Sequence, residues 1–115
     1  MRHLVAIALL LTSVRPVAAE DMDSANFWLP RCQKLLNALE DRAITGPANE
    51  FGQGVCLGMI ISVEAVSGVC APLNATKQQG TRVVVAYIQA RPARMHESFL
   101  KLALEAMKAA WPCPK

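Results

Sequence analysis

The sequence is poor in the residues from which catalytic sites are usually built. It holds only two histidines, His3 and His96, and aromatic residues make up 5% of the chain. Catalysis near neutral pH needs a base within reach of a nucleophile, and His96 has only Arg94 and Glu97 beside it. The nine acidic residues form no pair outside expected helical faces and helix ends. We therefore expect no enzyme, and a hydrolase that uses His96 is a minor alternative.

Metal-binding and haem-attachment patterns are also lacking. The four cysteines, Cys32, Cys56, Cys70 and Cys113, include no two at the spacing of zinc ligands or of a C-x-x-C motif. The chain has no basic stripe of the kind that binds nucleic acid. We expect no metal, no cofactor and no nucleic-acid partner.

The N-terminus follows the pattern of a secretory signal peptide. A short cationic start, Met1-Arg2-His3, is followed by an apolar stretch over residues 4–14 and by the cleavage pattern Val17-Ala18-Ala19. The apolar stretch is too short to span a bilayer as a helix. We expect residues 1–19 to be removed on export to the periplasm and residues 20–115 to form one domain, with no membrane span after cleavage. A buried N-terminal helix is the alternative.

Removal of the signal peptide changes the charge of the protein. The full chain has a net charge of +3 and a pI near 8.8. Arg2 and Arg15 leave with the signal, so ten basic and nine acidic residues remain and the net charge becomes +1. The basic pI of the precursor is thus no argument for a nucleic acid or an anionic membrane surface as partner.

Hydrophobic spacing predicts an all-α domain of four helices. Apolar residues recur at helical spacing over residues 30–42, 49–69, 77 to the break at Arg91-Pro92, and 93–110. Pro30 is expected in the first turn of its helix, where a proline gives up no hydrogen bond. A strand is the competing interpretation of residues 55–63.

Each predicted helix has a face that should be buried. The second helix is expected to present Phe51, Val55, Cys56, Met59, Ile60, Val63 and Val66 or Val69. The third, capped by Thr76 with Gln79, should bury Val83, Val84, Tyr87 and Ile88. The fourth should bury Met95, Phe99, Leu102, Ala103, Ala106, Met107 and Ala110, and expose the charged residues Glu97, Lys101, Glu105 and Lys108.

An even number of cysteines in a small exported domain indicates disulfides. In one continuous helix Cys56 and Cys70 would lie about 20 Å apart, whereas a disulfide needs Cα atoms within about 7 Å. In an up-down bundle neighbouring helices are antiparallel, which places Cys32 near Cys56 and Cys70 near Cys113. We predict these two pairs, Cys32–Cys56 and Cys70–Cys113.

The candidate partner-binding residues lie in two turns. An exported domain without catalytic groups is most simply a binding module, and binding residues concentrate in loops. The turn between the first two helices supplies Thr45, Asn49 and Glu50. Arg91 and Arg94, on either side of Pro92, could hold an acidic partner; a solvated turn without function is the alternative.

Several motifs together resemble a known family. They are Phe51-x-x-Gly54-x-Cys56-x-Gly58, Cys70-x-Pro72, Tyr87-Ile88-x-x-Arg91-Pro92 and Trp111-Pro112-Cys113. Over about residues 27–113 the chain resembles the Rap/Tai family of periplasmic immunity proteins, small helical proteins that neutralise peptidoglycan amidases delivered by type VI secretion. The resemblance implies a homodimer that occludes the active-site cleft of a toxin with a protruding segment.

The predicted function is therefore that of a periplasmic immunity protein whose partner is a cell-wall amidase. The motifs are mostly structural, so they support the fold more strongly than the activity. The alternative is a periplasmic stress chaperone or an envelope structural protein. A chaperone that is activated by acid needs clustered carboxylates that become protonated. The sequence has few such clusters and gives this alternative little support.

Overall fold

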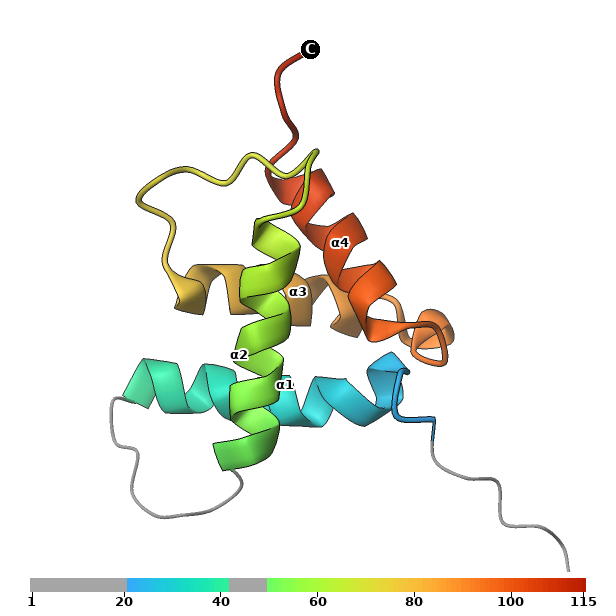
Figure 1. Cartoon of the computed structure of the whole chain (residues 1–115). Coiled ribbons are helices and arrows are strands. Elements are labelled where there is room, and N and C mark those ends of the chain that lie inside the picture. The colour runs from blue at the N-terminus through green and yellow to red at the C-terminus, as the bar shows by residue number, and fades with distance from the viewer. Residues whose placement is uncertain (1–20, 42–49) are drawn as a thin grey trace, which may run out of the picture.

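Four α-helices account for most of the regular structure in residues 21–41 and 50–115, the part of the chain that this computed structural model describes (Figure 1). They are α1 (Ala25–Asp41), α2 (Glu50–Glu64), α3 (Lys77–Gln89) and α4 (Phe99–Ala110), with a short 3-10 helix, η1 (Pro92–Arg94), before the last. Within these ranges strand-like pairing is confined to two isolated bridges, Ser24 with Ser98 and Val69 with Pro112. The all-α prediction is confirmed. The predicted signal peptide lies outside the described residues.

The helices cross in two layers. α1 and α3 lie side by side, and α2 and α4 pack across them (Figure 1). Because α2 crosses α1, the antiparallel up-down bundle assumed for pairing the cysteines is wrong. The pairing itself is confirmed, since the structure contains both the Cys32–Cys56 and the Cys70–Cys113 disulfides.

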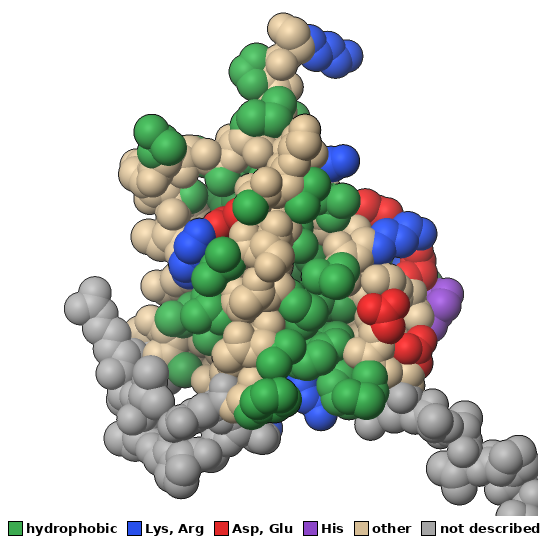
Figure 2. All heavy atoms as spheres, viewed as in Figure 1, with side chains coloured by type: hydrophobic (Ala, Val, Ile, Leu, Met, Phe, Trp, Pro, Cys, Tyr) green, Lys and Arg blue, Asp and Glu red, His purple; other side chains and the backbone are tan. Residues whose placement is uncertain are grey.

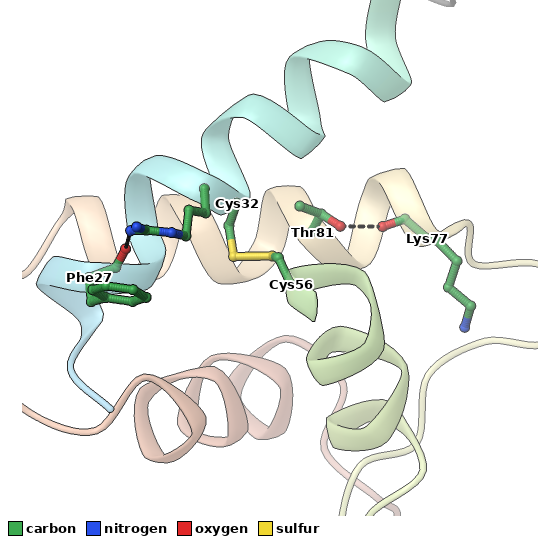
Figure 3. The surroundings of a disulfide bond; sticks show 6 residues. Phe27, Cys32, Cys56, Lys77 and Thr81 are labelled. Atoms are coloured by element: carbon green, nitrogen blue, oxygen red, sulfur yellow. Dashed lines mark hydrogen bonds between the residues drawn. A yellow bond between two sulfur atoms is a disulfide. The ribbon is translucent and has the colours of Figure 1, made fainter. Parts of the chain in front are cut away.

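The hydrophobic core fills the space between the two layers. Its largest fully buried side chains are Phe99, Ile60, Ile88, Leu102, Met107 and Val84. The Cys32–Cys56 disulfide lies in this core and links α1 to α2, with its Cα atoms 5.5 Å apart (Figure 3). The buried hydroxyl of Thr81 donates a hydrogen bond of 2.8 Å to the Lys77 carbonyl, which satisfies a polar group that would otherwise be costly to bury.

α1 begins five residues before the expected position, so Pro30 lies inside the helix and not in its first turn. The first turn of a helix has N–H groups without intrahelical partners. Here the Ala25 N–H donates to the Glu97 carbonyl at 2.9 Å and the Asn26 N–H to the Met95 carbonyl at 2.8 Å. These tertiary bonds stabilise the start of α1 together with a local cap, since the Ser24 hydroxyl accepts a bond of 3.3 Å from the Phe27 N–H.

α2 ends at Glu64, five residues before the predicted end at Val69. Gly68 adopts a φ of 95°, in the left-handed region that favours glycine, and Val69 pairs with Pro112. The segment after α2 is thus drawn to the end of α4. The assumption of one helix from Cys56 to Cys70 was wrong, although the pairing that it favoured is confirmed.

α4 begins at Phe99, not near Ala93, because the preceding residues form η1 and a turn whose carbonyls bond to α1. The Ser98 hydroxyl caps the helix by accepting a bond from the Lys101 N–H. The central residues of the predicted stripe are buried, but Ala110 is exposed. In α3 the Thr76 cap is confirmed, and Val85 is buried although it was not predicted to be.

Candidate functional site

The outward side of α2 carries apolar and small residues where a surface helix normally carries polar ones. We define the α2 face as the five exposed residues Phe51, Gly54, Gly58, Ile61 and Ser62. Phe51 is 84% exposed and Ile61 45% exposed. Figure 2 shows hydrophobic side chains gathered over α2, whereas acidic side chains gather on another part of the same view. Phe51, which was predicted to be part of the core, is therefore a surface residue.

No charged residue occurs in α2 between its terminal residues Glu50 and Glu64. A surface helix of a globular protein usually places charged residues opposite its buried stripe, and a helix that is apolar on all sides is usually covered. The one hydroxyl of the α2 face, that of Ser62, donates to the Gly58 carbonyl at 2.8 Å. The α2 face is thus uncharged and has the character of a protein-binding surface.

The two glycines of the α2 face are not packed against any other part of residues 21–41 and 50–115. A Cβ atom built at Gly54 or at Gly58 would meet nothing within 4 Å. At Gly52, by contrast, a Cβ would lie 3.3 Å from Cδ of Arg31. Each glycine in a helix costs about 1 kcal/mol relative to alanine. Gly54 and Gly58 leave the helix backbone open to close approach by another chain.

Aromatic and cationic side chains of α1 lie next to the start of α2. The guanidinium carbon of Arg31 stands 3.6 Å from the centre of the Phe27 ring and 5.8 Å from that of Trp28. Arg31 also donates to the Phe27 carbonyl (Figure 3) and lies against Gly52. Arginine often supplies much of the binding energy in protein interfaces, and Arg31 here contacts α2 at Gly52, the residue after Phe51.

A second surface feature is the loop of residues 70–76 between α2 and α3, which projects from the helices in Figure 1. Leu73 at its tip is fully exposed. The Ala75 N–H donates to the Pro72 carbonyl at 2.9 Å, which closes a turn with Leu73 and Asn74 at its centre. This loop was not among the predicted binding elements, although the apolar Leu73 between Pro72 and Asn74 is a signal in the sequence that could have indicated it.

Both ends of this loop are fixed. At one end Cys70 is joined to Cys113 with a Cα–Cα distance of 5.0 Å, and its N–H donates to the Trp111 carbonyl at 2.9 Å. At the other end the Thr76 hydroxyl accepts a bond of 3.1 Å from the Gln79 N–H. The loop therefore presents Leu73 on a braced support.

The structure brings two of the predicted binding residues, Arg91 and Arg94, to one corner, where both make contacts within the chain. Arg91 stacks on the Tyr87 ring, with its guanidinium carbon 3.5 Å from the ring centre, and donates to the Tyr87 carbonyl at 2.9 Å. Arg94 donates to Glu97 at 2.5 Å and to Glu105 at 2.8 Å. Arg94 thus links the turn before α4 to the middle of that helix.

The ion pairs at this corner shift the pKa values of their members. Hydrogen bonds from Arg94 and then from Lys101 lower the pKa of Glu97 to about 2. The bond from Arg94 likewise lowers the pKa of Glu105, to which the Tyr87 hydroxyl also donates at 3.1 Å. Bonds to Glu97 and then to Glu105 raise the pKa of Arg94. The charged face predicted for α4 is in part an ordered network and not a freely solvated one.

The other predicted binding residues are Thr45, Asn49 and Glu50. Thr45 and Asn49 lie outside the described residues. Glu50 is the first residue of α2, directly before Phe51.

In residues 21–41 and 50–115 no three His, Cys, Asp or Glu side chains are grouped as they would be around a metal ion. Among the helices of the same ranges, none combines the length and apolarity that crossing a membrane requires.

A crossed four-helix domain with two disulfides, an uncharged exposed helix face and a braced apolar loop belongs to the class of small protein-binding domains. The family model of the Rap1a immunity proteins matches residues 24–113, and the chain belongs to this family. The resemblance found in the sequence is thereby confirmed. Neither a curated protein nor a solved structure matches the chain.

Proposed function

We propose that this protein is an exported immunity protein that inhibits a peptidoglycan amidase in the periplasm by covering its active site, without catalytic activity of its own. Its membership of an immunity protein family supports a role in neutralising a toxin. The observation that carries the binding role is the exposed α2 face, which has no charged residue and no cover within the described chain. The signal-peptide pattern and the two disulfides support export.

The two surfaces differ in the kind of partner that suits them. Interfaces of permanent homodimers are more apolar than those of partners that meet only occasionally. The α2 face, with Phe51, Ile61 and two open glycines, fits a second copy of the chain that covers it throughout the life of the protein. We therefore propose a homodimer that packs through the α2 face.

The braced loop suits a toxin that arrives later. A single exposed leucine is tolerated on a free surface, and a narrow loop can enter a cleft that a helix face cannot. We propose that Leu73 and Asn74 enter the amidase cleft. Thr45, Asn49 and Glu50 stay proposed as neighbouring contacts, and Arg91 and Arg94 as weaker ones, since their guanidinium groups are engaged within the chain.

The inhibitory role is tested with the mature protein, residues 20–115, and a peptidoglycan amidase encoded beside its gene. Binding is measured by calorimetry and inhibition by release of cleaved peptidoglycan. We expect stoichiometric inhibition, and Leu73→Asp should weaken it at least tenfold. Leu100→Asp is the matched control, because Leu100 is also an exposed leucine but lies on α4. If the wild-type protein binds no such amidase, the proposed function is wrong.

The homodimer is tested separately by analytical ultracentrifugation. The wild-type protein should sediment as a dimer, Phe51→Asp as a monomer that remains folded, and Leu100→Asp as a dimer. A wild-type monomer at all concentrations would refute this interface. Binding of many unfolded proteins by the α2 face, with no preference for an amidase, would instead favour the chaperone alternative.

A further inference from the structure

The two disulfides differ sharply in their access to solvent. Cys32 and Cys56 are both 0% exposed and lie inside the core between α1 and α2 (Figure 3). Cys70 is exposed and Cys113 is partly exposed. Thiol–disulfide exchange requires a thiolate to approach one of the sulfur atoms, so access selects which bond reacts. An incoming thiol can reach the Cys70–Cys113 bond in the folded protein, whereas the Cys32–Cys56 bond is shielded.

The charges along the chain next to the exposed disulfide favour the same reaction. The Lys108 side chain lies over Gly68, two residues before Cys70, since a Cβ there would be 3.1 Å from Lys108 Cε. Residues 65–76 and 106–113 contain no acidic side chain, so the Lys108 charge has no acidic counterpart within these two segments. Positive charge near a cysteine attracts the attacking thiolate and stabilises the thiolate that leaves.

The fold can lose this bond locally. Cys113 lies three residues beyond the end of α4, outside any helix, and its partner lies at the start of the loop of residues 70–76. Without the disulfide, the described contacts between these segments include the Val69–Pro112 bridge and the hydrogen bond from the Cys70 N–H to the Trp111 carbonyl. The fully buried core residues and the Cys32–Cys56 bond lie elsewhere, while Val69 and Trp111 of these segments are only partly buried against that core. Cleavage therefore removes the covalent tie at this end of the loop, while the fully buried core and its own disulfide stay in place.

We propose that Cys70–Cys113 is a reversible thiol-exchange site for a dithiol reductant, and that its reduction regulates the protein by releasing the loop that presents Leu73. The first thiolate of the reductant bonds to Cys70 Sγ, and Cys113 leaves as a thiolate that takes up a proton. The second thiolate of the reductant then bonds to the first reductant sulfur and displaces Cys70. The reductant ends as a disulfide, and the two protein sulfurs gain two electrons and two protons. The regulatory part rests on the proposed function.

The exchange site itself is tested without a partner. The mature protein is treated with dithiothreitol over a range of times, quenched with iodoacetamide and mapped by peptide mass spectrometry. We expect Cys70 and Cys113 to be alkylated at least tenfold faster than Cys32 and Cys56. The same treatment in denaturant is the control and should remove the difference. Equal rates in the folded protein, or faster reaction of Cys32 and Cys56, would overturn the proposal.

Hydrogen exchange of the partly reduced protein tests whether the opening is local. Amides in residues 69–76 and 111–115 should lose protection at least tenfold, while those of Ile60, Val84 and Leu102 keep it. Loss of protection throughout the core would overturn the proposal. The double variant Cys70→Ser/Cys113→Ser provides the same state without reductant and should match the reduced protein in this measurement.

The regulatory consequence is measured as inhibition of the amidase by the oxidised, partly reduced and double-variant proteins. We expect the partly reduced protein and the double variant to inhibit at least tenfold more weakly than the oxidised protein. Reoxidation should restore inhibition by the partly reduced protein. Equal inhibition by all three would overturn the regulation. If even the oxidised protein does not inhibit, the proposed function fails, while the mass-spectrometric result still decides whether the exchange site exists.

Discussion

At the scale of single residues, Arg94 has the most connected side chain described in this structure. It reaches Glu97 in the turn before α4 and Glu105 within the helix, and Glu105 also accepts a bond from Tyr87 of α3. The sequence placed the two glutamates on the exposed face of one helix. It could not place Arg94 over them, because this depends on the fold of η1 and not on helical spacing.

The Arg94 network should make stability depend on pH. The pKa of Glu97 is about 2 in the folded protein, against an ordinary value of 4.5, so folding favours its charged form. The stabilisation that Glu97 provides to the folded protein is complete at pH values above its ordinary pKa of 4.5. It is lost as the pH falls from about 4.5 toward 2. Arg94→Ala should lower the melting temperature at pH 7 and have a clearly smaller effect at pH 2.5, measured by circular dichroism.

Arg82→Ala is the matched control for this prediction. Its partner Glu40 is on the surface, and both side chains of that pair are well exposed. Surface ion pairs contribute about 0–1 kcal/mol, so this variant should unfold nearly as the wild type does at both pH values. An equal effect of Arg94→Ala at pH 7 and pH 2.5 would show that the network is not the source of the pH dependence.

At the scale of elements, the sequence predicted the four helices and most of their ends, but not the starts of α1 and α4 or the end of α2. Apolar spacing identified four helices because burial of one face largely determines where a helix forms. The starts of α1 and α4 depend on hydrogen bonds of Ala25 and Asn26 to residues just before α4. Such bonds join segments far apart in the sequence and leave no local pattern; the only local signals for these two starts are the capping serines, Ser24 and Ser98. The same holds for the end of α2, because the bridge between Val69 and Pro112 holds the segment after Glu64 against the end of α4.

The α2 face could be predicted only in part. Its apolar composition was visible in the sequence, but composition does not distinguish a face that packs inside the chain from one that packs on another molecule. Phe51 was therefore assigned to the core, and the structure places it on the surface. The sequence also does not show whether Gly54 and Gly58 pack against a neighbour. In the structure nothing within the described residues occupies the space beside them.

Substitution of Gly58 by alanine should have opposite effects on folding and on assembly. Alanine is favoured over glycine in a helix by about 1 kcal/mol, and the Cβ meets no atom within 4 Å. Urea unfolding at low protein concentration, where the monomer dominates, should show a gain of up to about 1 kcal/mol. Analytical ultracentrifugation should show a weaker dimer, because the methyl group keeps the second backbone away.

Gly52→Ala is the control for this element. Its Cβ would lie 3.3 Å from Cδ of Arg31, so the gain in helix propensity is offset by displacement of a neighbour. This variant should gain less stability than Gly58→Ala and should keep the wild-type dimer. A Gly58→Ala protein that dimerises as tightly as the wild type would argue against close backbone contact at this position.

At the scale of the whole molecule, the two disulfides should contribute to stability in different ways. Cys32–Cys56 spans 24 residues and Cys70–Cys113 spans 43. Restriction of the unfolded chain then predicts about 3.5 and about 4 kcal/mol respectively. The first bond also fills the core, so its removal as Cys32→Ala/Cys56→Ala adds the loss of buried contacts.

We therefore expect Cys32→Ala/Cys56→Ala to be the less stable double variant, although the disulfide that it lacks closes the shorter loop of the unfolded chain. Urea unfolding of both double variants beside the wild type measures the difference. The comparison is informative because chain restriction alone predicts the opposite order. If Cys70→Ser/Cys113→Ser is the less stable of the two, the exposed bond holds more of the fold than its local surroundings indicate.

The order of the disulfides along the chain has a consequence for biogenesis. The first cysteine pairs with the second and the third with the fourth. A chain that is translocated from its N-terminus delivers its cysteines in this same order. On the proposed export route, an oxidase that joins each newly arrived cysteine to the unpaired one before it would produce the native connectivity directly, and we expect this protein to mature without an isomerase.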